Sequence, residues 1–371
     1  MSIHIRLIIQ QERLSGFNKK LHCNPNFIFY NGSINNHCRF SLIAMSKKVL
    51  LIPNMPGWSL EKNARDIINF NHSDLYFEIC QFGDFIHNSA DLYNEFDLIY
   101  PMTNRLFDEF LIRGLPVDKV ITGIRSFVSW DKGKTVPPGY NAKPPDGFIR
   151  RMKKALLVNT NCLKLWYIFS RHLPVVYTKY TCDLEVFYPD KRKRDTDKLV
   201  VGWTGSLTNN ENEKTQYRGF HDIIKPACEM VDGIELRPQI AEMEWIRDDH
   251  RMREYYNSID LYICASKSES GPRPVLEAAA CGVPSLTTDV GLVPELIENN
   301  INGIVVERSV EAMVEKLKYL SANRELLPLM GRKVRQKMEE DFQWKKIIPQ
   351  WIDFFQRALN LHDIKEKLAI K

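Results

Sequence analysis

Two glutamates, Glu269 and Glu277, stand eight residues apart in the stretch ESGPRPVLEAAACGVP, residues 269–284. Ionised carboxylates accept hydrogen bonds from hydroxyl groups, so Glu269 could face a polar ligand and Glu277 could accept from a diol. Two solvated acids near the start of a helix are a common alternative. The glycine and two prolines between the glutamates make the stretch more specific than its spacing alone.

The residues around this pair predict a strand, a turn and a helix. DLYICAS, residues 260–266, is typical of a buried strand. Pro274 predicts the first turn of a helix, and Gly282 with Pro284 beyond it predicts the helix end. This order places a carboxylate and free backbone N–H groups at a helix N-terminus, where a phosphate is favoured.

Composition limits the class of protein. The chain has 371 residues, which suggests about two domains, and 44% of them are hydrophobic. Its net charge of +5 is too small for a dedicated nucleic-acid binder, so no nucleic-acid partner is expected. The eight cysteines and nine histidines lack the spacing of metal ligands, so no metal site is expected. No apolar run approaches the ~18 residues of a membrane span, and no signal peptide is apparent. We therefore expect a cytoplasmic protein and leave peripheral contact with the inner membrane face open.

Alternating strand and helix patterns predict an α/β fold with parallel, doubly wound sheets. In a protein with two such sheets, the cleft between them is the default site. The expected organisation is an N-terminal extension of uncertain structure (1–44), which would fit an upstream start codon, a first Rossmann-like domain (45–188), a charged linker (189–197), a second Rossmann-like domain (198–345) and a C-terminal helix (346–371).

The stretch 269–284 resembles the Glu-x7-Glu signature of the family 4 retaining glycosyltransferases, which have the GT-B fold of two facing Rossmann-like domains with a C-terminal crossover helix. VVGWTGS (200–206) with QYRGFHDIIKPA (216–227) resembles the opening of that family's donor domain. TTDVGLVPELIENNINGIVV (287–306) resembles the strand, Val-Gly loop and helix after the signature. CDLEVFYP (182–189) resembles bacterial surface-polysaccharide members.

The resemblance implies a role for each residue that matches. Glu269 would contact hydroxyls of the transferred sugar, Glu277 would bind the ribose, and Arg218 would face the diphosphate. A guanidinium suits that place because it forms paired, charge-assisted bonds to phosphate oxygens. The predicted catalytic residues are therefore Glu269 and Arg218, and the predicted donor-binding residues are Gly205, Lys214, Ser270, Gly271, Pro272, Arg273 and Glu277.

This chain departs from the family pattern at three places, the first being Ser270, Gly271 and Pro272, where the family often has Gly-Phe-Gly. Arg273 stands where an apolar residue is usual and could reach the donor's sugar or phosphate. Phe127 stands where many members have a histidine near the reaction centre. The departures at Arg273 and Phe127 support an alternative, a non-catalytic sugar-nucleotide-binding subunit, beside which a GT-B epimerase is a third and less specific possibility.

Other residues point to chemistry less specifically. Gly57 and Trp58 follow the first predicted strand, and with Ser126 they are the expected acceptor side, although Trp58 could equally be a packing residue. The basic runs 150–154 and 191–194 could contact anionic lipid or only water. The apolar stripe of the C-terminal helix predicts packing across the domains; it comprises Ile347, Ile348, Trp351, Phe354 and Phe355.

The sequence thus predicts a metal-independent, retaining glycosyltransferase without a cofactor. Its co-substrate would be a nucleotide diphosphate sugar, and its acceptor a glycan or lipid-linked molecule in bacterial surface polysaccharide synthesis. Base, sugar and linkage stay open.

Overall fold

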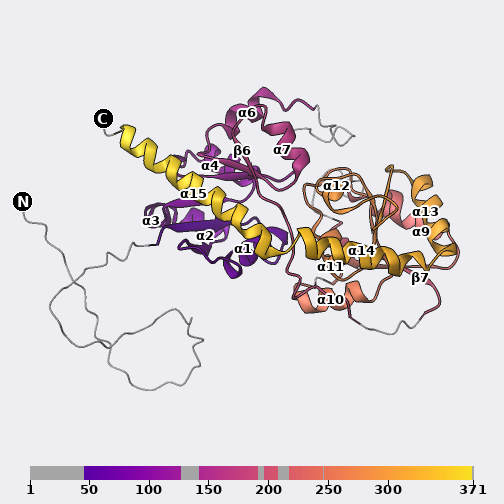
Figure 1. The fold of residues 1–371 in the computed structure, drawn as a ribbon. Coiled ribbons are helices and arrows are strands. Elements are labelled where there is room, and N and C mark those ends of the chain that lie inside the picture. The colour runs from indigo at the N-terminus through magenta and orange to yellow at the C-terminus, as the bar shows by residue number, and fades with distance from the viewer. Residues whose placement is uncertain (1–45, 127–141, 191–195, 208–216, 245, 370–371) are drawn as a thin grey trace, which may run out of the picture. The chain divides into compact units, whose positions relative to one another are not determined.

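Parallel strands and intervening helices make up both halves of the chain, as the alternating pattern predicted (Figure 1). The computed structural model describes residues 46–126, 142–190, 196–207, 217–244 and 246–369. The described residues after position 45 form one compact unit.

The first half is built on two three-stranded parallel sheets, in the orders β2-β1-β3 and β4-β5-β6. A parallel bridge between Ile99 and Val120 connects them. The strands are β1 (Lys48–Ile52), β2 (Tyr76–Ile79), β3 (Leu98–Pro101), β4 (Thr122–Ile124), β5 (Val158–Thr160) and β6 (Val175–Tyr177). The helices of this half are α1 (Ser59–Asn69), α2 (Phe82–His87), α3 (Ser89–Glu95), α4 (Asn104–Ile112), α6 (Asp146–Met152) and α7 (Leu163–Phe169).

The second half has a five-stranded parallel sheet in the order β11-β10-β9-β7-β8. Its strands are β7 (Leu199–Gly205), β8 (Ile234–Ile240), β9 (Leu261–Cys264), β10 (Ser285–Thr288) and β11 (Ile304–Val306). The helices are η1 (Phe220–Ile224), α9 (Lys225–Glu229), α10 (Asp249–Asn257), α11 (Arg273–Ala280), α12 (Val293–Leu296), α13 (Val310–Ala322), α14 (Leu326–Asp341) and α15 (Trp344–Ala369).

Local signals explain where several elements begin. The hydroxyl of Thr103 accepts from the amide of Leu106 and caps α4. Helix α10 begins at Asp249. The carboxylate of Asp248 accepts from the amide of Arg251 at 2.8 Å, so this aspartate sets the helix start.

The chain crosses back to the first half at its C-terminal end. Helix α14 packs on α11, and α15 then runs along α1 (Figure 1). The hydroxyl of Thr181, on the outward connection, donates to the carbonyl of Phe342 on the return at 2.5 Å. Phe355 of α15 meets Phe77 of β2 edge to face, with ring centroids 5.0 Å apart. All five residues of the predicted apolar stripe are buried, so α15 is the expected crossover helix.

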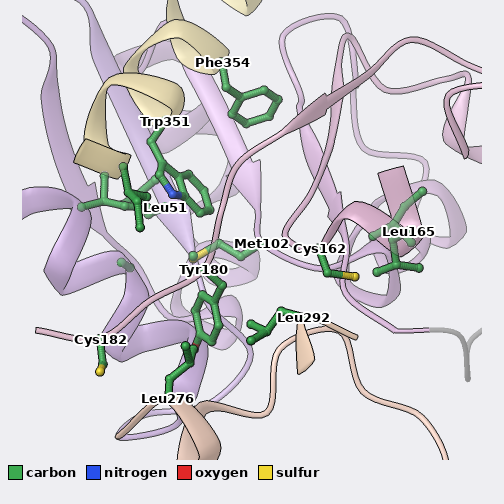
Figure 2. Packing of buried hydrophobic residues seen from close by; sticks show 14 of the residues in the cluster. Leu51, Met102, Cys162, Leu165, Tyr180, Cys182, Leu276, Leu292, Trp351 and Phe354 are labelled. Atoms are coloured by element: carbon green, nitrogen blue, oxygen red, sulfur yellow. The ribbon is translucent and has the colours of Figure 1, made fainter. Parts of the chain in front are cut away.

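A hydrophobic core continues from the first sheet into α11. Leu51 and Trp351 belong to the same buried cluster as Tyr180, Leu276 and Leu292. Figure 2 shows Tyr180 pointing toward Leu276 and Leu292. Buried apolar side chains therefore hold α11 and the loop before α12 against the first half. In the described ranges, no helix combines the length and apolarity that a membrane crossing requires.

Candidate functional site

The Glu269–Glu277 stretch forms the strand, turn and helix that its residues predicted. Strand β9 is wholly buried and leads into the loop, and α11 starts at Arg273 with Pro274 in its first turn. Gly282 follows the helix with φ of 71°, a left-handed conformation that glycine adopts without strain. The two glutamates are thereby placed on the loop and on the helix of one rigid unit.

Two glycines fix the path of the signature loop. Gly291 has φ of 52°, and a Cβ there would lie 2.3 Å from the carbonyl oxygen of Ser270. A Cβ at Gly271 would lie 2.7 Å from the Tyr180 ring and 2.9 Å from Leu292. The amide of Leu292 donates to the Ser270 carbonyl at 2.9 Å. The Val-Gly loop and the signature loop therefore pack backbone to backbone, which only glycine permits.

A cleft of about 190 Å³ lies at the carboxyl ends of the second sheet's strands, where Gly205 ends β7 and Cys264 ends β9. Glu269 lines this cleft, and the hydroxyl of Ser266 donates to its carboxylate at 3.3 Å. Ser270 is 5% exposed and lies outside the lining, whereas Gly271 and Pro272 contribute to it. Of the predicted donor-binding residues that the structure describes, all except Ser270 line the cleft.

Glu277 lines the cleft although it is buried. One carboxylate oxygen, Oε1, accepts from Nε of Arg273 at 2.7 Å, and the other, Oε2, accepts from the hydroxyl of Tyr256 at 2.9 Å. Burial, and secondly the Glu277 charge, raise the pKa of Tyr256 well above its usual range. Tyr256 therefore stays protonated and donates to Glu277.

Arg273 was predicted to reach the donor's sugar or phosphate, and that role stays a prediction. Its guanidinium lines the cleft but already bonds two carboxylates. Besides Glu277, it contacts Oδ2 of Asp66 on α1 at 3.3 Å. Only 4% of Arg273 is exposed, so these contacts fix the guanidinium in a buried position.

Burial raises the pKa of Asp66 to about 6, and the neighbouring Arg273 charge opposes this rise. At pH 7 Asp66 is therefore ionised and pairs with Arg273. A carboxyl group whose pKa is raised by folding stabilises the folded state at low pH. This contribution is lost as the pH rises through about 6. The charge on Asp66 thus costs folding energy and has to be compensated by its partner.

Arg218 lies against the end of β7. A Cβ at Gly205 would lie 3.1 Å from Nη1 of Arg218, and both residues line the cleft. Gly219 follows with φ of 74°, and a Cβ there would lie 2.7 Å from the carbonyl of Ala265. This glycine therefore lets the segment that carries Arg218 approach the end of β9. Lys214 and Phe127 lie outside the described residues.

The acceptor-side predictions differ in outcome. Gly57 and Trp58 line the cleft from the first half, between β1 and α1. Gly57 has φ of 76°, and the side chain of Arg247 lies over it. Ser126 follows β4 and is not among the described residues that line the cleft. The structure therefore brings two of the three residues to the site.

Residues 228–337 match the family described as Glycosyl transferases group 1. Over 209 residues, the chain is 28% identical to an uncharacterized glycosyltransferase of Haemophilus influenzae, covering 56% of this chain and 52% of the relative. Over 101 residues it is 34% identical to N-acetyl-alpha-D-glucosaminyl L-malate synthase of Bacillus anthracis, which covers 27% of this chain and 26% of that relative. This segment belongs to the group 1 glycosyltransferases. The matches span about half or less of the length of these curated relatives.

Solved structures confirm the GT-B fold around the group 1 segment. Anabaena HepE in complex with UDP and glucose superposes with a TM-score of 0.61 at 14% identity, covering 83% of this chain and 98% of that one. Sucrose-phosphate synthase from Thermosynechococcus elongatus superposes with a TM-score of 0.62 at 13% identity, covering 85% of this chain and 99% of that one. The predicted fold of two parallel α/β halves is therefore correct.

Sequence reasoning missed residues that meet the group 1 segment at the cleft. Lys62 of α1 lines it and forms an ion pair with Asp249 at the start of α10. Tyr256 and Tyr262 also line it, and both are buried. Polar spacing along one helix could not single out Lys62, because its partner lies far away in the sequence. In the sequence, the two tyrosines fit the pattern of ordinary buried apolar residues.

Replacing Gly291 with alanine should disturb the group 1 signature loop. The new Cβ would clash with the Ser270 carbonyl in a left-handed backbone, and such strain costs about 1–3 kcal/mol. Chemical denaturation should show this loss of stability. Gly83→Ala is the matched control, because nothing lies within 4 Å of its Cβ position, and it should leave stability unchanged or slightly higher. Wild-type stability of Gly291→Ala would contradict the packing described here.

Proposed function

We propose that this protein transfers a sugar from a nucleoside diphosphate sugar to a glycan or lipid-linked acceptor, with retention of configuration at the anomeric carbon. The observation that carries the proposal is the cleft of the group 1 segment. Glu269, Arg218 and Glu277 line that cleft together with Gly57 and Trp58. The named relatives are transferases or synthases, and nothing among them favours a non-catalytic binding subunit.

Each residue has a defined task in this proposal. As the bond between the anomeric carbon and the diphosphate breaks, negative charge grows on the leaving phosphate, and Arg218 would stabilise it. Glu269 would hold hydroxyls of the transferred sugar. Glu277 would accept from the ribose. The acceptor oxygen would bond to the anomeric carbon on the face that the diphosphate leaves, and the proton of the acceptor hydroxyl would pass to an oxygen of the leaving diphosphate. A guanidinium can supply the positive charge, so we expect transfer without a divalent metal.

A panel of nucleoside diphosphate sugars tests the donor half. The Anabaena structure holds UDP and glucose, which makes UDP-sugars the first donors to try. We expect at least one donor to raise the melting temperature, and the same donor to be hydrolysed or transferred, with or without EDTA. Binding without turnover would support the non-catalytic alternative. Loss of turnover in EDTA alone would overturn metal independence, and absence of all binding would overturn the proposal.

Arg218→Ala should lower kcat much more than it weakens donor binding. Removing a donor of charge-assisted bonds from the transition state typically costs about 2.7–4 kcal/mol, a factor of 10²–10³ in rate. Steady-state kinetics with the best donor measure this effect. Arg113→Ala, an exposed arginine paired with Glu109 on α4, is the control and should keep the wild-type rate. A wild-type kcat for Arg218→Ala would argue against the assigned role.

We also infer peripheral contact with anionic lipid, in keeping with a lipid-linked acceptor in surface polysaccharide synthesis. Leu163, Trp166 and Tyr167 form an exposed apolar face on α7. Helix α6 packs on α7 through Phe148 and Phe169, whose rings are 5.6 Å apart. The exposed Lys153 and Lys154 follow α6. Exposed apolar side chains on α7 and exposed basic side chains after the neighbouring helix α6 would together suit an anionic membrane surface.

Vesicle sedimentation tests this contact. We expect the protein to bind vesicles that contain phosphatidylglycerol more tightly than pure phosphatidylcholine. The double variant Lys153→Gln/Lys154→Gln should lose about thirtyfold in binding, since each basic residue contributes about 1 kcal/mol and two are removed. Arg332→Gln/Lys333→Gln on α14 is the matched control, an exposed basic pair elsewhere in the chain. Equal binding to both vesicle types would rule out this docking surface.

A further inference from the structure

Arg273 occupies a place in the signature where family members usually carry an apolar residue. It is buried at the first position of α11, although a positive charge at a helix N-terminus is unfavourable. A buried guanidinium is retained only where partners compensate its charge. Its partners are carboxylates from two different elements, Glu277 of α11 and Asp66 of α1. The position of Arg273 is thus determined from both halves of the chain.

The contact with Glu277 leaves that carboxylate able to bind more. Arg273 bonds Oε1 at 2.7 Å, and the hydroxyl of Tyr256 bonds Oε2 at 2.9 Å. Each carboxylate oxygen has two lone pairs, so each oxygen retains one acceptor site. Two neighbouring hydroxyls, as in a ribose diol, need two such acceptors side by side. Arg273 and Tyr256 therefore set the orientation of Glu277 and leave both oxygens open to a diol.

The contact with Asp66 extends this arrangement to the first half. Asp66 lies on α1, and the loop of Gly57 and Trp58 leads directly into that helix. Two nitrogens of the guanidinium lie 3.3 and 3.4 Å from the same Asp66 oxygen. The ring of Tyr180 packs beside the guanidinium, with its centroid 5.9 Å from Cζ. Rotation of Arg273 away from Glu277 would break all of these contacts.

We propose that Arg273 is a positioning residue that holds Glu277 in the orientation that binds the ribose of the donor. It acts through Glu277 and makes no contact with the donor itself. This inference rests on the proposed function, because it assigns Glu277 to the nucleotide. It replaces the expectation from sequence that Arg273 reaches the donor's sugar or phosphate directly.

A double-mutant cycle on nucleotide affinity tests this inference. Calorimetry with uridine diphosphate, or the nucleoside diphosphate that the wild type binds best, gives Kd for each variant. We expect Arg273→Met and Glu277→Gln each to raise Kd about tenfold or more, the value of one lost charged hydrogen bond. In the Glu277→Gln background, Arg273→Met should then change Kd by less than about twofold, because both substitutions remove the same interaction.

A control variant of a second arginine that contacts α11 distinguishes a positioning role of Arg273 from a purely structural one. Arg335 of α14 also holds α11, donating to the carbonyls of Ala280 at 2.6 Å and Phe187 at 2.8 Å, at the end of the helix away from the cleft. Arg335→Met should lower the melting temperature and leave Kd unchanged. If it raises Kd as much as Arg273→Met does, Arg273 is only a structural residue.

The remaining outcomes are also decisive. Additive effects of Arg273→Met and Glu277→Gln would mean that Arg273 contacts the nucleotide directly, which overturns the inference. If Arg273→Met is insoluble, Arg273→Lys decides, since lysine keeps the charge but loses the fork that spans two carboxylates. Wild-type Kd in Arg273→Lys would overturn the inference while the proposed function stands. If the wild type binds no nucleoside diphosphate, both proposals fall.

Discussion

A buried guanidinium is the constraint on which the rest of this site depends. Arg273 is withdrawn from water, so its charge must be met by carboxylates in fixed places. Asp66 on α1 and Glu277 on α11 meet it. Because those helices belong to different halves, their separation at the cleft is limited by the reach of one side chain. The Lys62–Asp249 ion pair, from α1 to α10, adds a second contact of this kind.

Close backbone packing also supports the loop and helix that carry the carboxylates of the cleft. Gly291 and Gly271 let the loop before α12, the signature loop and Tyr180 approach more closely than any other residue would permit. Figure 2 shows the apolar side of this contact, where Tyr180 points toward Leu276 and Leu292. The carboxylates of the cleft thus stand on a rigid base. Binding groups held in this way lose little entropy when a ligand arrives.

Local patterns predicted the fold and the signature unit correctly. Pro274, Gly282 and the buried strand before them act within a few residues, so they can be recognised in sequence. The residues that pair with Arg273 and with Lys62 could not be recognised in this way. Asp66 meets Arg273 across 207 positions, and Lys62 meets Asp249 across 187. Such contacts depend on how the two halves are placed relative to each other. Local hydrophobic periodicity in the sequence does not predict that placement. Arg273 was recognised as unusual for its position. The direction in which its side chain points could not be predicted, because its partner Asp66 was not known.

The charge balance around α11 restricts how a diphosphate could be bound. At neutral pH, Asp66 and Glu277 together outweigh Arg273 by one negative charge. The helix N-terminus therefore offers less attraction to an anion than its dipole alone would suggest. Besides Arg273, the basic residues lining the described cleft are Arg218 and Lys62, and Lys62 is paired with Asp249. Within the described residues, the diphosphate would thus depend mainly on Arg218, which lies over Gly205 at the end of β7.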